Sequence, residues 1–127
     1  MRKFNEFELQ KQIAQYLRTA YKDVMFLSDV RASLKLTIPQ QVRAKKLQAE
    51  SFACPDMIIF FPSQGHHAMF LEFKADSPYK LNGELKRSDH LDAQWKAILR
   101  LRKLGYHADF YWSVDTAMAT IKAYLKW

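Results

Sequence analysis

Several residue types are scarce in this sequence, and each scarcity excludes a class of protein. Cys54 is the only cysteine in 127 residues, which excludes an intrachain disulfide and is typical of a reducing compartment. Three glycines leave no room for a Walker loop or a dinucleotide-binding fingerprint. One cysteine and four histidines without paired spacing argue against a structural zinc site.

Long apolar segments are also missing. The longest apolar run is Met57–Phe61, far short of the roughly 20 residues that cross a bilayer. The first residues contain no apolar region typical of a secretory signal. We therefore expect a single soluble domain over residues 1–127, located in the cytoplasm and without a membrane partner.

Apolar and basic residues are abundant. Apolar residues make up 49% of the chain, with nine Phe, six Tyr and three Trp, which predicts a substantial hydrophobic core. Twenty Lys and Arg against 13 Asp and Glu give a net charge of +7. A basic surface attracts polyanions, so nucleic acid is the first partner to consider, with mere solubility as the alternative.

The spacing of apolar residues predicts an α/β fold. Helical periodicity marks residues 5–21, 37–49 and 88–104, with a closing helix opened by Ser113 or Asp115. Short apolar segments predict strands at residues 24–27, 56–61, 68–74 and 106–112. This order favours a mixed central sheet of about four strands with helices packed on it.

A predicted hairpin brings charged residues together. Side chains alternate across a strand, so Glu72 and Lys74 share one face, roughly 6–7 Å apart. If the turn centre lies at residue 64 or 65, antiparallel partners have numbers summing to 128–130, which places Asp56 opposite residues 72–74. We therefore expect Asp56, Glu72 and Lys74 to meet at the open end of the hairpin.

Two carboxylates at close range repel each other when ionised and therefore raise each other's pKa. A bound divalent cation removes this electrostatic cost. Oxygen ligands suit Mg²⁺ or Mn²⁺, which can polarise a phosphodiester and lower the pKa of a bound water. Lys74 would add a positive charge beside the nucleophile. The alternative is an ordinary ion pair on a solvated strand face. It fits poorly, because both strands are apolar on both faces and therefore look central.

Two further polar residues lie on apolar helix stripes. Glu6 falls on the stripe of Leu9 and Ile13, and Gln94 falls on the stripe that contains Ile98 and Leu101. Each could be a residue at a frayed helix end or a buried polar residue whose hydrogen bonds are satisfied. Alternatively, each belongs to the same site on the sheet.

At this point the residues resemble a family. Pro55-Asp56 followed by Glu72-Phe73-Lys74 resembles the PD-(D/E)xK nuclease signature, with the two acids 16 residues apart (72 − 56). The first-helix segment Glu6-Phe-Glu-Leu-Gln10 resembles the E-x-x-I/L-Q motif of the VRR-NUC (virus-type replication-repair nuclease) branch. The C-terminal half of this chain also resembles that branch, through Gln94 and the segments Leu101-Arg-Lys-Leu-Gly-Tyr106 and Ser113-Val-Asp115.

The resemblance implies a restriction-endonuclease-like α/β/α core that hydrolyses DNA with Mg²⁺ or Mn²⁺. Asp56 and Glu72 become metal ligands, and the backbone carbonyl of Phe73 becomes a third. Lys74 becomes the catalytic lysine, Glu6 an acid that binds metal directly or through water, and Gln94 a supporting residue. Stand-alone members of this branch resemble dimeric, structure-selective nucleases such as Holliday-junction resolvases, in bacterial or phage-infected cells.

Two departures from the family pattern concern the surroundings of the site. Ala53 stands where the family commonly has glycine, and the loop Ala75–Arg87 is longer than usual. Residues expected to bind DNA precede the Asp56 strand or lie in this loop; they are Arg31, Lys35, Arg43, Lys45, Lys46, Lys80, Lys86 and Arg87.

Three functions remain open from the sequence. The favoured one is a homodimeric, metal-dependent endonuclease on branched DNA. A nuclease on single-stranded or flap DNA would use the same residues in a different groove. A basic nucleic-acid-binding module without catalysis is the third. The pair His66 and His67, in the hairpin turn, is expected to be a surface feature away from the site.

Overall fold

The computed structural model describes residues 5–29, 36–49 and 52–126, and its elements follow the predicted order. The helices are α1 (Glu6–Ala20), α2 (Ile38–Lys46), α3 (Asp89–Lys103) and α4 (Val114–Leu125). The strands are β1 (Phe26–Ser28), β2 (Met57–Ile59), β3 (Met69–Phe73) and β4 (His107–Tyr111). None of the helices in these ranges is long and apolar enough to cross a membrane.

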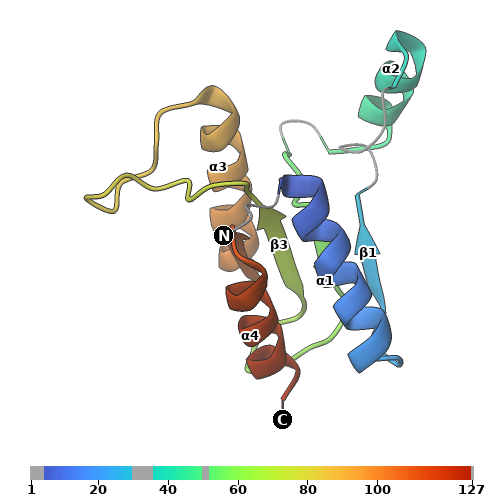
Figure 1. The fold of residues 1–127 in the computed structure, drawn as a ribbon. Helices are drawn as coiled ribbons and strands as arrows, with labels where there is room; N and C mark the ends of the chain where they lie inside the picture. Colours follow the sequence, from blue (N-terminus) through green and yellow to red (C-terminus); the bar gives the residue numbers. More distant parts are fainter. Residues whose placement is uncertain (1–4, 30–35, 50–51, 127) are drawn as a thin grey trace.

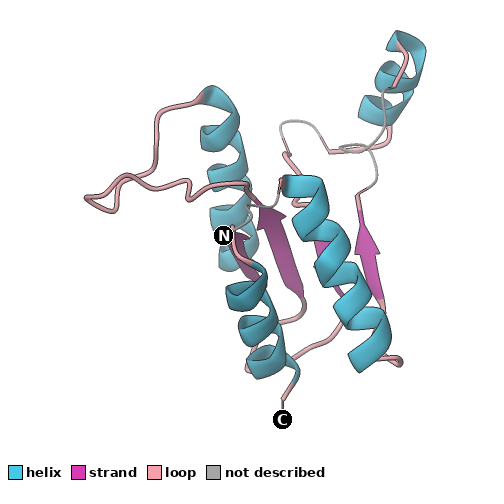
Figure 2. Ribbon diagram, viewed as in Figure 1, coloured by secondary structure: helices cyan, strands magenta, loops and turns pink. Residues whose placement is uncertain are grey.

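The four strands form one mixed sheet in the order β1-β2-β3-β4. The first two pairings are antiparallel, and β3 and β4 are parallel because α3 carries the chain back to the other end of the sheet. Helices α1 and α4 cover one face and α3 covers the other (Figures 1 and 2). The predicted α/β/α layering around a mixed four-stranded sheet is confirmed, and β2 and β3 are its central strands.

Each face of the sheet has its own hydrophobic core. Alternate residues of β3 point to opposite faces, so Leu71 and Phe73 pack against α1 and α4, whereas Phe70 packs against α3. β3 is buried along its whole length. A charged group at the end of such a strand is therefore shielded from water, and its charged form is disfavoured.

Capping side chains fix where the helices begin. The side chains of four N-cap residues accept a hydrogen bond from the backbone N–H three residues later; these are Asn5, Thr37, Ser88 and Ser113. Ser113, rather than Asp115, therefore opens α4. On α4, Ile121 and Leu125 are buried, whereas Met118 is only partly buried.

Some element boundaries differ from the sequence-based expectation, each for a local reason. β1 begins at Phe26 rather than at residue 24, because the Val24 N–H is bonded to Tyr21 O in the turn after α1. α2 ends at Lys46 rather than near residue 49, and none of its residues is buried, so no packing extends it. His67 is exposed in the hairpin turn, as expected, whereas the ring of His66 is only partly exposed because it packs against His107 and Tyr124.

Gly105 supports the turn between α3 and β4, and replacing it should destabilise the fold. Its φ of +93° favours glycine, and a Cβ there would lie 2.8 Å from the His67 ring. We expect Gly105→Ala to lower the free energy of unfolding by about 1–2 kcal/mol in urea denaturation. The double variant with His67→Ala should recover only the steric part of this loss. An unchanged midpoint in Gly105→Ala would contradict the prediction.

Candidate active site

The hairpin of β2 and β3 brings two acids together at its open end. Met57 pairs with Leu71, so partner numbers sum to 128 and Asp56 lies beside Glu72, at the lower limit of the predicted range. The Phe73 N–H donates a hydrogen bond of 2.8 Å to Asp56 Oδ2. This bond fixes the Asp56 carboxylate against the end of β3.

The environment of the two acids disfavours their charged forms. Burial and the neighbouring Asp56 charge raise the pKa of Glu72 to about 9, with Lys74 acting in the opposite direction. Burial also raises the pKa of Asp56, although the Phe73 N–H and a hydrogen bond from Glu72 oppose this shift. In the absence of a cation, both shifts favour a proton on the pair, held mainly by Glu72, over two ionised carboxylates.

Lys74 and Glu6 complete the charged cluster. Lys74 follows β3 directly, is 9% exposed, and has its backbone N–H bonded to Tyr111 O at 2.8 Å. Its Nζ lies 3.9 Å from Glu6 Oε1 at the first turn of α1. Glu6 is more exposed and lies at the rim, so it contributes charge to the cluster without being enclosed by it.

Two residues that the sequence reasoning did not assign support the Asp56 backbone. Gln10, buried on α1, donates through Nε2 to Asp29 O at 3.1 Å and to Asp56 O at 3.2 Å. The Asp29 N–H donates a hydrogen bond to Asp56 O at 2.7 Å. The negative charge of the Asp29 carboxylate is one of the causes that raise the pKa of Asp56. Gln10 thus joins α1 to the ends of β1 and β2. Gln10 is the last residue of the Glu6–Gln10 motif, and that motif is the feature of the sequence that could have identified it.

Gln94 reaches the acids from the opposite face of the sheet. Its Nε2 donates to Glu72 Oε1 at 2.8 Å, and the same nitrogen lies 3.1 Å from His90 Nε2. Gln94 is buried, as its place on the apolar stripe of α3 indicated. His90 lies one turn earlier on the same helix face, and the spacing of four residues could have identified it.

The donor set fits a hard divalent cation of the Mg²⁺ type. Within the described ranges, no three His, Cys, Asp or Glu side chains are arranged to hold an ion by themselves. Mg²⁺ commonly takes only one or two carboxylates and completes its shell with water and phosphate oxygens. Asp56 and Glu72 supply those two carboxylates. The Phe73 carbonyl points to the same side of β3 as its N–H, which faces Asp56.

The basic residues expected to bind DNA divide into three groups. Arg31 and Lys35 lie outside the described residues. Arg43, Lys45 and Lys46 are exposed on α2. Lys80, Lys86 and Arg87 are exposed in the segment between β3 and α3, which projects away from the body of the domain (Figure 1), and Lys80 Nζ lies 3.9 Å from Glu84 Oε2.

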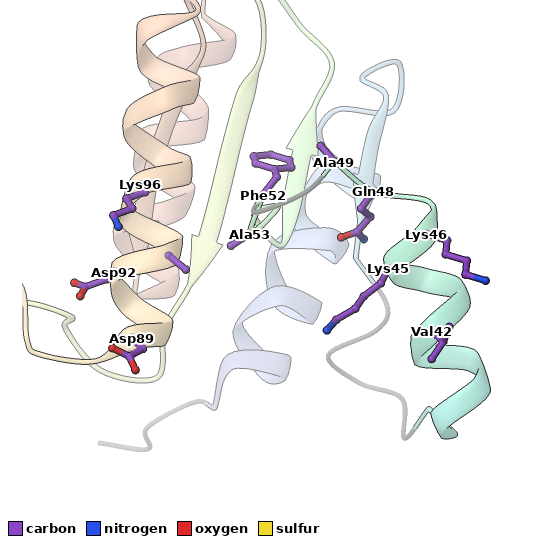
Figure 3. Close-up of a pocket in the computed structure, with 11 residues that line it drawn as sticks. Val42, Lys45, Lys46, Gln48, Ala49, Phe52, Ala53, Asp89, Asp92 and Lys96 are labelled. Carbon is purple, nitrogen blue, oxygen red and sulfur yellow. The ribbon is translucent and has the colours of Figure 1, made fainter.

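A wide groove of about 1150 Å³ lies between α2 and the beginning of α3 (Figure 3). Lys45 and Lys46 line its α2 side, and Lys96 lines the α3 side. Asp89 and Asp92 make part of the α3 wall acidic. Phe52 and Ala53 also line the groove. Ala53 stands three residues before Asp56 in the sequence and is the position that departed from the family pattern.

Comparison with known proteins supports the fold. No protein-family model and no curated protein matches the chain. Among solved structures, a protein described as a VRR_NUC domain protein is similar, with a TM-score of 0.64 and 21% sequence identity. The alignment covers 98% of this chain and 90% of that chain. The chain therefore has the fold of the VRR-NUC domain, the fold that its sequence motifs implied.

Proposed function

We propose that residues 1–127 form a single nuclease domain, a metal-dependent DNA endonuclease that hydrolyses phosphodiester bonds. The observation that carries this proposal is the convergence of Asp56, Glu72 and Lys74 at the end of a central hairpin. Burial disfavours the ionisation of both acids at once, so placing them together costs free energy. A bound cation would compensate for this cost, which makes the pair a candidate metal site. The VRR-NUC fold supports the same function.

Each residue then has a distinct role. Asp56, Glu72 and the Phe73 carbonyl hold Mg²⁺ or Mn²⁺, with Glu6 at the rim acting directly or through water. The bound cation supplies Lewis-acid polarisation of the phosphodiester and a lower pKa for the attacking water. Lys74 places a positive charge where negative charge develops on the phosphorane. Gln94 holds Glu72 in position.

In the reaction, a water oxygen forms a bond to phosphorus while the bond between phosphorus and the leaving oxygen breaks. The attacking water loses a proton, and the leaving oxygen gains one. The Lys74 charge acts on both acids, and Lys74 would orient that water.

We propose branched DNA, such as a four-way junction, as the substrate, and a homodimer as the active form. Both proposals rest on the family resemblance. A two-fold-symmetric junction needs paired cuts, which a two-fold dimer with one site per chain supplies. A second candidate is a nuclease on single-stranded or flap DNA, and the lysine-lined groove that contains Phe52 favours it.

The direct test is a cleavage assay on labelled four-way junctions, flaps, duplexes and single strands. The assay is run with Mg²⁺, with Mn²⁺ and with EDTA, and the mass of the protein–DNA complex is measured alongside. We expect cutting with either metal and none with EDTA, and the preferred substrate decides between the two candidates. Binding that EDTA leaves unchanged, with no cutting of any substrate, would instead indicate a non-catalytic binding module.

The α2 lysines should contribute to DNA affinity through phosphate contacts. We expect Lys45→Ala and Lys46→Ala each to weaken binding and to reduce the slope of log K against log salt by about 1, without sequence preference. Fluorescence anisotropy over a salt series measures both quantities. Lys122→Ala in the last turn of α4, outside the groove, is the matched control. Equal effects of Lys45→Ala and Lys122→Ala would show that the groove is not the binding surface.

A further inference from the structure

His90 and Gln94 form a hydrogen-bonded pair that ends on the buried acid Glu72. His90 lies in the first turn of α3, which Ser88 caps, and its exposed ring reaches the Gln94 amide one turn later. The single Gln94 nitrogen makes both contacts, 2.8 Å to Glu72 Oε1 and 3.1 Å to His90 Nε2. The site as described so far gives His90 no role.

The direction of each hydrogen bond in this network follows from which nitrogen atoms carry hydrogens. An amide nitrogen only donates, so with one N–H directed to Glu72 the other is directed to His90. His90 Nε2 must then accept, which requires the neutral ring with its proton on Nδ1.

The opposite amide orientation is disfavoured by burial. Gln94 Oε1 is buried and has no hydrogen-bond partner within the described part of the chain. A flipped amide would place two N–H donors at that position and would turn its oxygen toward Glu72 Oε1. Two buried donors without acceptors cost more than one acceptor without a donor. Burial thus favours the orientation in which Gln94 Nε2 faces Glu72. A hydrogen-bond acceptor at position 90 favours the same orientation, because it accepts the second N–H of that nitrogen.

We propose that His90 is a positioning residue that fixes the orientation of the Gln94 amide, and through it the Glu72 carboxylate that holds the cation. This inference rests on the proposed metal site and goes beyond it by assigning a residue that touches neither the cation nor the substrate. The ring acts as a hydrogen-bond acceptor, and the requirement is for an acceptor at the distance of Nε2 rather than for a histidine as such.

Two variants of similar size and helix propensity separate this role from simple packing. His90→Gln places an amide oxygen near the position of Nε2, whereas His90→Leu removes the acceptor. Mn²⁺ affinity of the full chain is measured by electron paramagnetic resonance of the free ion. The Gln94 side-chain amide is followed by ¹⁵N–¹H correlation spectra without metal, and thermal unfolding of each variant is recorded.

We expect His90→Leu to weaken Mn²⁺ binding about tenfold, corresponding to one lost hydrogen bond, and to shift the Gln94 amide signals. His90→Gln should stay within about twofold of the natural chain in affinity and keep those signals. Equal affinities and equal Gln94 signals in the two variants would overturn the proposal. A natural chain that neither binds Mn²⁺ nor cuts DNA would instead overturn the proposed function, while the metal-free Gln94 spectra would still decide the role of His90.

Discussion

Glu72→Gln is expected to reduce phosphodiester cleavage by roughly three orders of magnitude while leaving the fold and DNA binding in place. Glutamine has the size of glutamate, and its amide oxygen can still accept the hydrogen bond from Gln94. It lacks the negative charge that a divalent cation requires of this ligand. The loss therefore concerns the chemical step, and single-turnover cleavage measures it.

The same experiment includes Lys74→Met, which removes the positive charge but keeps the apolar stem of a side chain that is mostly buried. We expect a comparable loss of rate with this variant. Glu84→Gln is the matched control, because Glu84 is an exposed acid paired with Lys80 in the projecting loop. Binding is compared by anisotropy in EDTA. Rates of Glu72→Gln or Lys74→Met within tenfold of the natural chain, with the control unchanged, would refute the assignment of the site.

The central hairpin could be predicted from the sequence because strand geometry leaves few alternatives. Side chains alternate with period two, and one short turn at residues 62–67 fixes the register, so Asp56 had to meet the end of β3. The apolar stripes of α1 and α3 likewise placed Glu6 and Gln94 on faces toward the sheet. Periodicity within each element, together with one turn, was sufficient for these contacts.

Other features depend on how elements pack against one another, which local pattern does not determine. Asp29 lies beside Asp56 because β1 pairs with β2 in the register that places Ser28 opposite Met57, and this register could not be read from the apolar run at residues 24–27. The groove depends on where α2, with no buried residue, lies relative to α3. His90 was accessible in principle, but its importance emerges only once the Gln94 nitrogen is seen to contact Glu72.

The stability of the metal-free protein should decrease as the pH rises, which is opposite to the usual behaviour of a paired carboxylate. Burial and the Asp56 charge raise the pKa of Glu72 from 4.5 to about 9 in the folded state. Between these values the folded chain holds a proton that the unfolded chain has released. Since stability changes with pH in proportion to the protons bound by the unfolded state minus those bound by the folded state, its slope is negative in this window. The raised pKa of Asp56 acts in the same direction.

We therefore expect urea denaturation in EDTA to show a free energy of unfolding lower by about 2–4 kcal/mol at pH 8.5 than at pH 5.5, from a limit of about 1.4 kcal/mol per pH unit for one proton. Glu72→Gln should remove most of this slope and be more stable than the natural chain at pH 8.5, whereas Glu84→Gln should retain it. Saturating Mg²⁺ should also flatten the slope, because the cation binds the ionised acids and displaces the proton. A natural chain whose stability is level or rises from pH 5.5 to 8.5 in EDTA would contradict the description of Asp56 and Glu72 as a buried pair that shares a proton.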